Sequence, residues 1–299
     1  MVIFFTGLYL FTAKAGAISV TLVPAADTTL IEVAPTNNNG GQAWVLSGRT
    51  QNGPRNRGLF RFDLSHIPTN AVIHYAALTL EVTRVPDEPP VNSTFGLHRM
   101  LRRWGEGDKT ATGANPPGRG LPATPGEATW LCAFHPTNEW SAPGSAEGAD
   151  FSSVESSFQF IAGLDTYRFD STPELVADVQ GWVNRPELNY GWLLLCNNED
   201  AIFTARRFGS REDPNSPPQL VIEYTVPLRI DSAQRIGDEF TLSFMAQPGQ
   251  LYTVEYYDAL CTNAWQPLAY VWTTTDARRF HVTDTSDAPQ RFYRLAISP

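Results

Sequence analysis

Hydrophobic and polar residues alternate along the stretch from Arg57 to Val82, and this pattern predicts two antiparallel strands joined by a turn. In RGLFRFDL the apolar residues fall mostly on one parity, and in AALTLEV they do so strictly. Period-two alternation is typical of a strand with one buried face. The segment between them, Ile67 to Asn70, carries turn chemistry around Pro68. The stretch therefore indicates a β-sandwich scaffold.

Similar short strands are predicted up to about residue 226. ISVTLVPAADTTLIEV gives two of them around a loop from Pro24 to Asp27, and WLLLCN, AIFTARRF and QLVIEYTV give others. The region from Arg102 to about Phe160 is irregular, rich in Gly, Pro, Ala and Ser, and carries three tryptophans. Long irregular segments inside a compact domain usually carry function when they are ordered.

One helix is expected, over residues 171–185. Ser171 or Thr172 can cap it, Pro173 suits its first turn, and apolar residues in STPELVADVQGWVNR recur at helical spacing. From residue 228 the sequence consists of six short segments in which polar and apolar residues alternate, separated by turns. These predict a second, smaller sandwich over residues 228–299, with a boundary near residue 227.

Composition narrows the function classes. The net charge is −9, and of 22 basic residues only Lys14 and Lys109 are lysines. The arginines are scattered, whereas a nucleic-acid surface needs clustered basic residues, so nucleic acid is not an expected partner.

Residues 1–17 combine an apolar run with Ala15-Gly16-Ala17, which predicts a signal peptide and a secreted protein, although Lys14 follows the run. The run is too short for a membrane span; the alternative is a buried first strand.

The three cysteines, Cys132, Cys196 and Cys261, are widely separated and odd in number. No disulfide framework follows from them, and at most one pair can exist. Buried free thiols are favoured over a Cys132–Cys196 bridge.

Several segments occur in the order found in one known family: ADTTL, NNNGG, RGLFRFDLSHIP, WGEG, ATW, VQGWVNRPELNYGWLL and FGSRED followed by PPQLVIEY. Residues 18–226 resemble the DNRLRE-type domain, related to the disaggregatase repeats and to carbohydrate-binding module family 96. The resemblance implies a jelly-roll β-sandwich in a secreted bacterial protein and a noncatalytic binding or adhesion role. The C-terminal region, with PGQLYTVEYYDAL, AWQPL and VTDTSDAPQRFYRL, resembles fibronectin type III-like modules, which implies spacer or attachment duty.

Carbohydrate binding would depend on aromatic rings that stack on sugar faces, with polar groups that bond the hydroxyls. Trp104, Trp130 and Trp140 lie in the irregular region and are the candidates, although scaffold roles are the alternative for each. Arg206 and Arg207 flank a strand end, where one can face solvent and bind an acidic sugar; an ion pair is the alternative. The expected partner is a polysaccharide or cell-surface glycan, and the oligomeric state stays open.

A structural Ca²⁺ is the one cofactor considered, because an acidic chain offers hard oxygen donors. Asp27, in the loop between the first strands, is the first candidate ligand, and Glu32, Glu212 or Asp213 could contribute. The alternative is that Asp27 caps a turn and that Glu212 pairs with Arg61 or Arg211.

Two other function classes stay open beside a noncatalytic binding protein. The common enzyme motifs are absent from the sequence, but a polysaccharide lyase or hydrolase could use Glu106 and Glu212, which predicts that both converge in an open groove. A structural or adhesive surface protein without glycan specificity predicts instead that all three loop tryptophans are buried.

Overall fold

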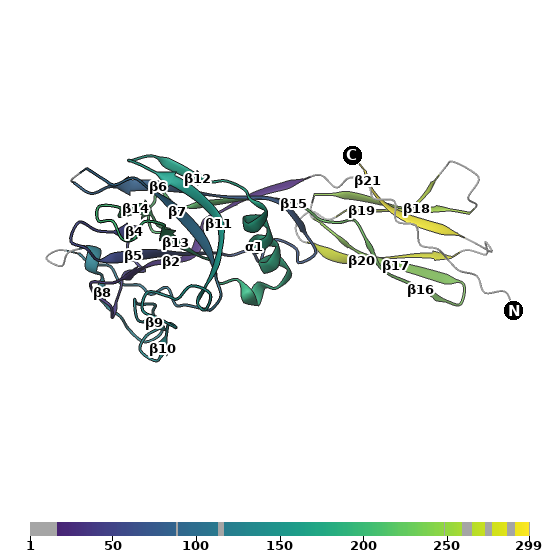
Figure 1. Ribbon diagram of the computed structural model, residues 1–299. Helices are drawn as coiled ribbons and strands as arrows, with labels where there is room; N and C mark the ends of the chain where they lie inside the picture. The colour runs from purple at the N-terminus through teal and green to yellow at the C-terminus, as the bar shows by residue number, and fades with distance from the viewer. Residues whose placement is uncertain are drawn as a thin grey trace. The chain divides into compact units, whose positions relative to one another are not determined.

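The computed structural model describes residues 17–87, 89–112, 117–247, 249–258, 265–272, 277–285 and 291–298. Residues 1–16 of the expected signal peptide and Cys261 lie outside these ranges. The described chain forms two compact units, residues 17–225 and the part from residue 226 onward. Both are built from antiparallel strands, and the described residues contain one α-helix (Figure 1). The expected all-β sandwich fold with one short helix is confirmed.

Eleven strands of the N-terminal unit form a continuous antiparallel ladder that curls into two layers (Figure 1). One layer contains, in spatial order, β1 (Ile18–Leu22), β15 (Gln219–Thr225), β6 (Val72–Arg84), β14 (Arg206–Gly209) and β4 (Trp44–Arg49), with β12 (Thr166–Phe169) also paired to β6. The other contains β11 (Phe151–Ile161), β7 (Ser93–Met100), β13 (Trp192–Cys196), β5 (Arg55–Phe62) and β2 (Pro24–Ile31). The layers join where the end of β4 pairs with the start of β5.

Strand β5 is buried on both faces, whereas the sequence pattern predicts one buried face. Phe60 and Phe62 are buried together with Trp192, against whose ring Phe62 packs edge to face at 6.1 Å. Leu59 points the other way and is also fully buried, in a separate cluster of apolar side chains that includes the three loop tryptophans. The outer face of this sheet is therefore covered by the long excursion between β7 and β11.

That excursion runs over residues 101–150 and contains the short strands β8 (Leu121–Pro122), β9 (Cys132–Phe134) and β10 (Asn138–Glu139), of which β8 pairs with β3 (Asn37–Asn38), and the 3₁₀ turn η1 (Pro117–Arg119). It ends about ten residues earlier than the expected 102–160, since β11 occupies Phe151–Ile161. β11 was missed because its serines and its register irregularities near Glu155 disrupt the alternation.

The helix α1 (Pro173–Asn184) forms where it is expected. The Thr172 hydroxyl accepts a hydrogen bond from Leu175 N at 3.0 Å and caps the first turn. Leu175, Val179, Trp182 and Val183 form its buried face, and α1 packs against β6 and β11. The 3₁₀ turn η2 (Pro186–Leu188) follows it. In the described part of the chain, no helix is long and apolar enough to cross a bilayer.

The C-terminal unit is a small sandwich of two three-stranded sheets. One contains β16 (Ile230–Ile236), β17 (Glu239–Ala246) and β20 (Arg278–Thr285); the other contains β19 (Gln266–Trp272), β18 (Leu251–Tyr257) and β21 (Phe292–Ser298). Its core is formed by alternate residues of both sheets, among them Leu242, Phe244, Val254 and Leu295. These six strands match the six alternating segments of the sequence.

Candidate functional site

The three tryptophans of the excursion are buried, with 4%, 4% and 5% of Trp104, Trp130 and Trp140 exposed. Trp104 Nε1 donates to Tyr190 O at 2.7 Å, and Trp140 Nε1 donates to Thr129 O at 2.8 Å. The structure corrects the expectation that these rings are displayed for stacking on a sugar. They were misplaced because a loop tryptophan that pins its own segment and one that faces solvent have the same sequence signature.

Arginines on the outer face of β5 contact the indole rings of two of these tryptophans. Arg61 lies over the Trp104 ring at 5.7 Å, and both Arg55 and Arg57 lie near the Trp130 ring, at 5.5 and 5.6 Å. Cation–π contacts of this kind are favourable when the charge is partly desolvated. The excursion is therefore attached to the sheet through an indole–guanidinium layer as well as through its apolar cluster.

Arg206, one of the two arginines predicted to bind ligand, is fully buried and is corrected to a structural residue. Its Nε donates to Ala162 O at 2.8 Å, and its Nη atoms donate to acceptors in two further segments: Phe203 O, Thr204 O, Ala205 O, Val91 O and Asn92 Oδ1. Burial lowers the pKa of this guanidinium. Its hydrogen bonds hold the turn before β14 and the ends of β7 and β11 together.

The four predicted calcium ligands do not form one site. Asp27 lies inside strand β2, where it neither caps a turn nor occupies a loop. Glu32 pairs with Arg55 at 2.6 Å, and Asp213 accepts from Asn215 N and Ser216 N in its own turn. Within the described ranges, no three His, Cys, Asp or Glu side chains are grouped so that they could hold a metal ion. The structure does not bring all four predicted calcium ligands together, which corrects the prediction that they share one site.

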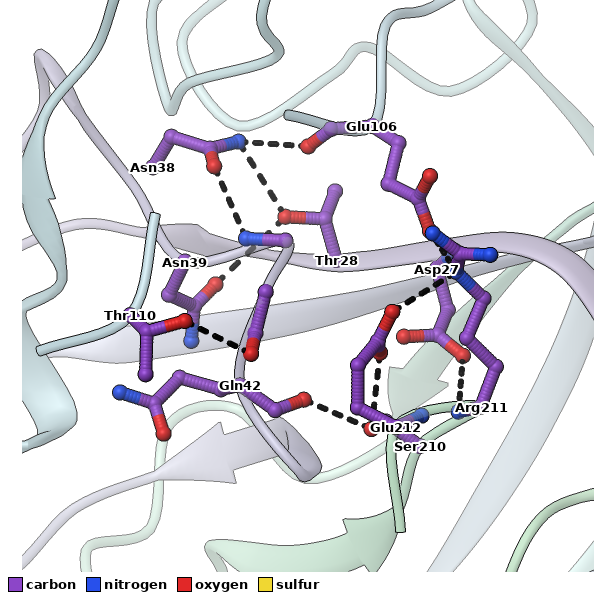
Figure 2. A network of polar contacts seen from close by, with 12 residues as sticks. Asp27, Thr28, Asn38, Asn39, Gln42, Glu106, Thr110, Ser210, Arg211 and Glu212 are labelled. Carbon is purple, nitrogen blue, oxygen red and sulfur yellow. Dashed lines mark hydrogen bonds and ion pairs between the residues drawn. The ribbon is translucent and has the colours of Figure 1, made fainter. Parts of the chain in front are cut away.

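Two of the four, Asp27 and Glu212, instead belong to a cluster with Glu106 and Arg211, called here the carboxylate cluster (Figure 2). Arg211 Nε lies 2.6 Å from Glu106 Oε1 and 2.8 Å from Glu212 Oε1. Arg211 N donates to Asp27 Oδ2 at 2.8 Å, and Asp27 N donates to Glu106 Oε1 at 2.9 Å. The alternative in which Glu212 pairs with Arg211 is thus confirmed. A guanidinium already supplies the positive charge that a Ca²⁺ would bring, so the cluster does not fit that ion.

Burial dominates the electrostatics of this cluster. It raises the pKa of Asp27 well above its ordinary value, against the lowering effect of the hydrogen bond from Arg211 N, and Glu212 and Glu106 raise it further. Burial also raises the pKa of Glu106. Desolvation disfavours the charged form of a carboxyl group, so these two side chains resist ionisation.

Asn38 and Asn39 of the NNNGG segment complete the network in Figure 2. Asn38 Nδ2 donates to Glu106 O at 2.7 Å and to Ala128 O at 2.9 Å. A Cβ on Gly40 would lie 2.3 Å from Glu106 O, so only glycine permits this approach. The segments ADTTL, NNNGG, WGEG and FGSRED therefore meet in one structural network.

Glu106 and Glu212 lie close together, as the enzyme alternative predicts. Both contact the guanidinium of Arg211, whereas that alternative places them in an open groove. Their side chains are 17% and 26% exposed, and the hollow described next is lined by other residues. A glycosidase needs two carboxyl groups on either side of a sugar bond. Here Arg211 occupies the space between them.

A hollow of about 290 Å³ lies on the N-terminal unit and is called here the arginine pocket. Its cationic groups are Arg84 at the end of β6, Arg119 in η1 and Arg207 in β14. Gln51 and Asn52 from the β4–β5 turn also line it, together with apolar side chains such as Leu46. Arg207 is the one predicted ligand-binding residue that the structure places in a hollow, because strand alternation sends it to the face opposite Arg206.

Arg207 is held in place without a carboxylate. Its guanidinium lies over the Trp44 ring at 4.2 Å, and no ion pair of Arg207 occurs among the described residues. Arg84 lies directly opposite Arg207 in the β6–β14 ladder. Burial lowers the pKa of Arg207, and the charge of Arg84 lowers it further. Two like charges in cross-strand register destabilise a sheet unless a counter-ion lies between them.

Little in the local sequence indicates this pocket. Arg84, Arg119 and Arg207 come from three segments more than thirty residues apart, and only the fold brings them together. The one local signal is the Arg206-Arg207 pair at a strand end. Both described cysteines, Cys132 and Cys196, are buried free thiols, so the bridge between them is not formed.

Comparison with known proteins adds no assignment. No protein-family model matches the chain, and no curated protein matches it.

Proposed function

We propose that the protein is a noncatalytic, secreted carbohydrate-binding or cell-surface adhesion protein whose N-terminal unit binds an acidic polysaccharide in the arginine pocket. One observation carries the proposal. Among the residues that the structure describes, three guanidinium groups and one carboxylate line one hollow, on a chain whose net charge is −9. The carboxylate is that of Asp87, which pairs with Arg84 at 3.4 Å. A local excess of positive charge on an acidic protein favours an anionic ligand.

The chemistry of the pocket suits a sugar carboxylate or sulfate. Arginine binds such groups through two parallel N–H donors, which fixes orientation as well as charge. Arg207 is already oriented by Trp44, so less side-chain entropy is lost when a ligand binds. Gln51 and Asn52 offer donors and acceptors for sugar hydroxyls, and the apolar wall at Leu46 suits the C–H face of a ring.

The resemblance of residues 18–226 to the DNRLRE-type domain supports a binding role, and the apolar run in residues 1–17 supports secretion. The carboxylate cluster and the buried tryptophans then act as scaffold. They fix the excursion and the β14–β15 loop of the unit that carries the pocket.

A second candidate is a structural or adhesive surface protein without glycan specificity. The burial of all three loop tryptophans favours it, since that is the arrangement it predicts. The two candidates differ in the arginine pocket, because a purely structural protein has no need for a guanidinium such as that of Arg207, which forms no ion pair within the described residues, in a hollow.

A glycan array with polyuronates, sulfated glycans and neutral glycans tests the proposal. We expect retention of acidic glycans by the full chain and its loss in Arg207→Gln, with Arg235→Gln as the control, since Arg235 is exposed on the C-terminal unit. Binding of no acidic glycan would favour the structural candidate. New reducing ends or unsaturated products in the same samples would favour an enzyme that uses Glu106 and Glu212.

A further inference from the structure

Two aromatic side chains on the C-terminal unit are far more exposed than any tryptophan of the excursion. Tyr270 and Trp272, on strand β19, are 68% and 61% exposed. Val271 between them is buried in the core of the unit. Because alternate residues of a strand share a face, both rings lie on the solvent side of the β19-β18-β21 sheet, about 6.6 Å apart along the strand.

Cross-strand neighbours extend this face. Leu251 lies opposite Trp272 and is itself exposed, and Thr253 lies opposite Tyr270. Ala296 of β21 follows on the far side of Thr253. Thr253 and Ala296 are small residues beside the large rings. These two rings and Leu251 are called here the aromatic stripe.

Two charges within the described part of this sheet neutralise one another. Arg294 and Glu255 form an ion pair in register between β21 and β18. Arg294 also lies over the Trp265 ring at 4.4 Å. The aromatic stripe therefore presents apolar ring faces beside polar groups with no net charge.

We propose that the aromatic stripe is a second carbohydrate-binding surface, which takes the apolar faces of successive pyranose rings of a neutral polysaccharide. Tyrosine and tryptophan combine a large rigid face with a polar edge, and two rings in line fit an extended chain. The polar groups of Glu255 and Arg294 are placed to bond hydroxyl groups at the rim.

The size of the stripe argues against a second protein copy as the occupant. The two rings expose about 320 Å² at most, since each aromatic side chain contributes about 150–250 Å² and the rings are 68% and 61% exposed; Leu251 adds a smaller area. A stable protein interface buries about 800 Å² on each partner. A sugar chain needs only a few ring contacts.

The stripe is independent of the arginine pocket, because it lies on the other unit and is apolar where the pocket is cationic. A pull-down of the full chain with insoluble cellulose and chitin suspensions tests it. Trp272→Ala and Tyr270→Ala remove the rings, and Phe158→Ala is the matched control, since Phe158 is 61% exposed on β11 of the N-terminal unit. Arg207→Gln separates this surface from the arginine pocket.

We expect the wild-type chain and Arg207→Gln to bind at least one of the two suspensions, and Trp272→Ala to lose at least about tenfold in affinity while unfolding like the wild type. Lack of binding by the wild type would overturn the inference. An equal loss in Phe158→Ala would show nonspecific adsorption and would also overturn it. Self-association that Trp272→Ala abolishes, without polysaccharide binding, would make a second copy the occupant and contradict the proposal.

Discussion

Trp140 Nε1 donates a 2.8 Å hydrogen bond to the carbonyl oxygen of Thr129, eleven residues earlier in the same excursion. Both residues are buried, at 5% and 0% exposed. A segment of fifty residues with little regular structure thus carries its own closed hydrogen bonds and its own apolar cluster against the outer face of the sheet. Order in this excursion comes from tertiary packing.

Replacement of Trp140 by phenylalanine tests this structural role. Trp140→Phe keeps an aromatic ring but leaves Thr129 O without its donor, so we expect a loss of about 1–3 kcal/mol in the free energy of unfolding. Chemical denaturation measures it. Glycan binding of the folded variant should stay unchanged; an unchanged stability with lost glycan binding would show that the ring contacts ligand.

Two neighbouring arginines should respond in opposite ways. Arg206→Gln removes donors from several buried carbonyl groups, each worth about 1–3 kcal/mol, so we expect a loss of about 3 kcal/mol or more. Arg207→Gln relieves the repulsion from Arg84 but loses the contact with the Trp44 ring, so the two effects offset each other and stability should change by less than about 1 kcal/mol. Denaturant titration of both variants measures their free energies of unfolding. Similar losses of stability in the two variants would contradict the assignment of Arg207 to ligand binding.

The pH dependence of stability should report on Asp27. Its pKa is raised by burial, so the folded state binds its proton more tightly than the unfolded state does. This contribution to stability is complete below the unfolded value near 3.8 and is lost as pH rises through the higher folded value. Asp27→Asn lacks it. The stability of the variant relative to wild type should therefore increase as pH rises from about 4 towards neutrality.

Thermal unfolding across that pH range measures the difference. Asp238→Asn, at an exposed position of the β16–β17 turn, is the control and should follow the wild type. A relative stability of Asp27→Asn that falls with rising pH would mean that the Asp27 carboxylate is stabilised by its surroundings.

The close approach of the NNNGG segment to the excursion gives a further prediction. Gly40→Ala places a Cβ 2.3 Å from Glu106 O and should destabilise the fold by about 1–3 kcal/mol. Gly181→Ala is the matched control, because no heavy atom lies within 4 Å of its Cβ in helix α1; it should stabilise by about 0.5–1 kcal/mol. Differential scanning calorimetry compares them, and equal melting temperatures would refute the close contact.

Local patterns predicted most of the fold. The alternation in β6, the cap of α1 at Thr172 and the six strands of the C-terminal unit depend on residues close together in the chain. Strand β11 was not predicted, because its register shifts interrupt the alternation of polar and apolar residues.

The site was harder to predict, because exposure is a tertiary property. The tryptophans are buried by a sheet face far away in sequence, and Arg206 and Arg207 differ only in the face to which the strand turns them. Tyr270 and Trp272 flank the buried Val271 in β19, but nothing local shows that their face stays uncovered.

The affinity of a purified uronic acid oligosaccharide for the full chain tests the central proposal most directly. Isothermal titration calorimetry at low and high salt would compare the wild type with Arg207→Gln and Arg235→Gln. We expect the wild type and Arg235→Gln to bind alike, with affinity that weakens as salt screens the guanidinium groups, and Arg207→Gln to lose at least about tenfold, or about 1.4 kcal/mol. Equal affinity of all three proteins, or no binding by any of them, would contradict the arginine pocket as the glycan site.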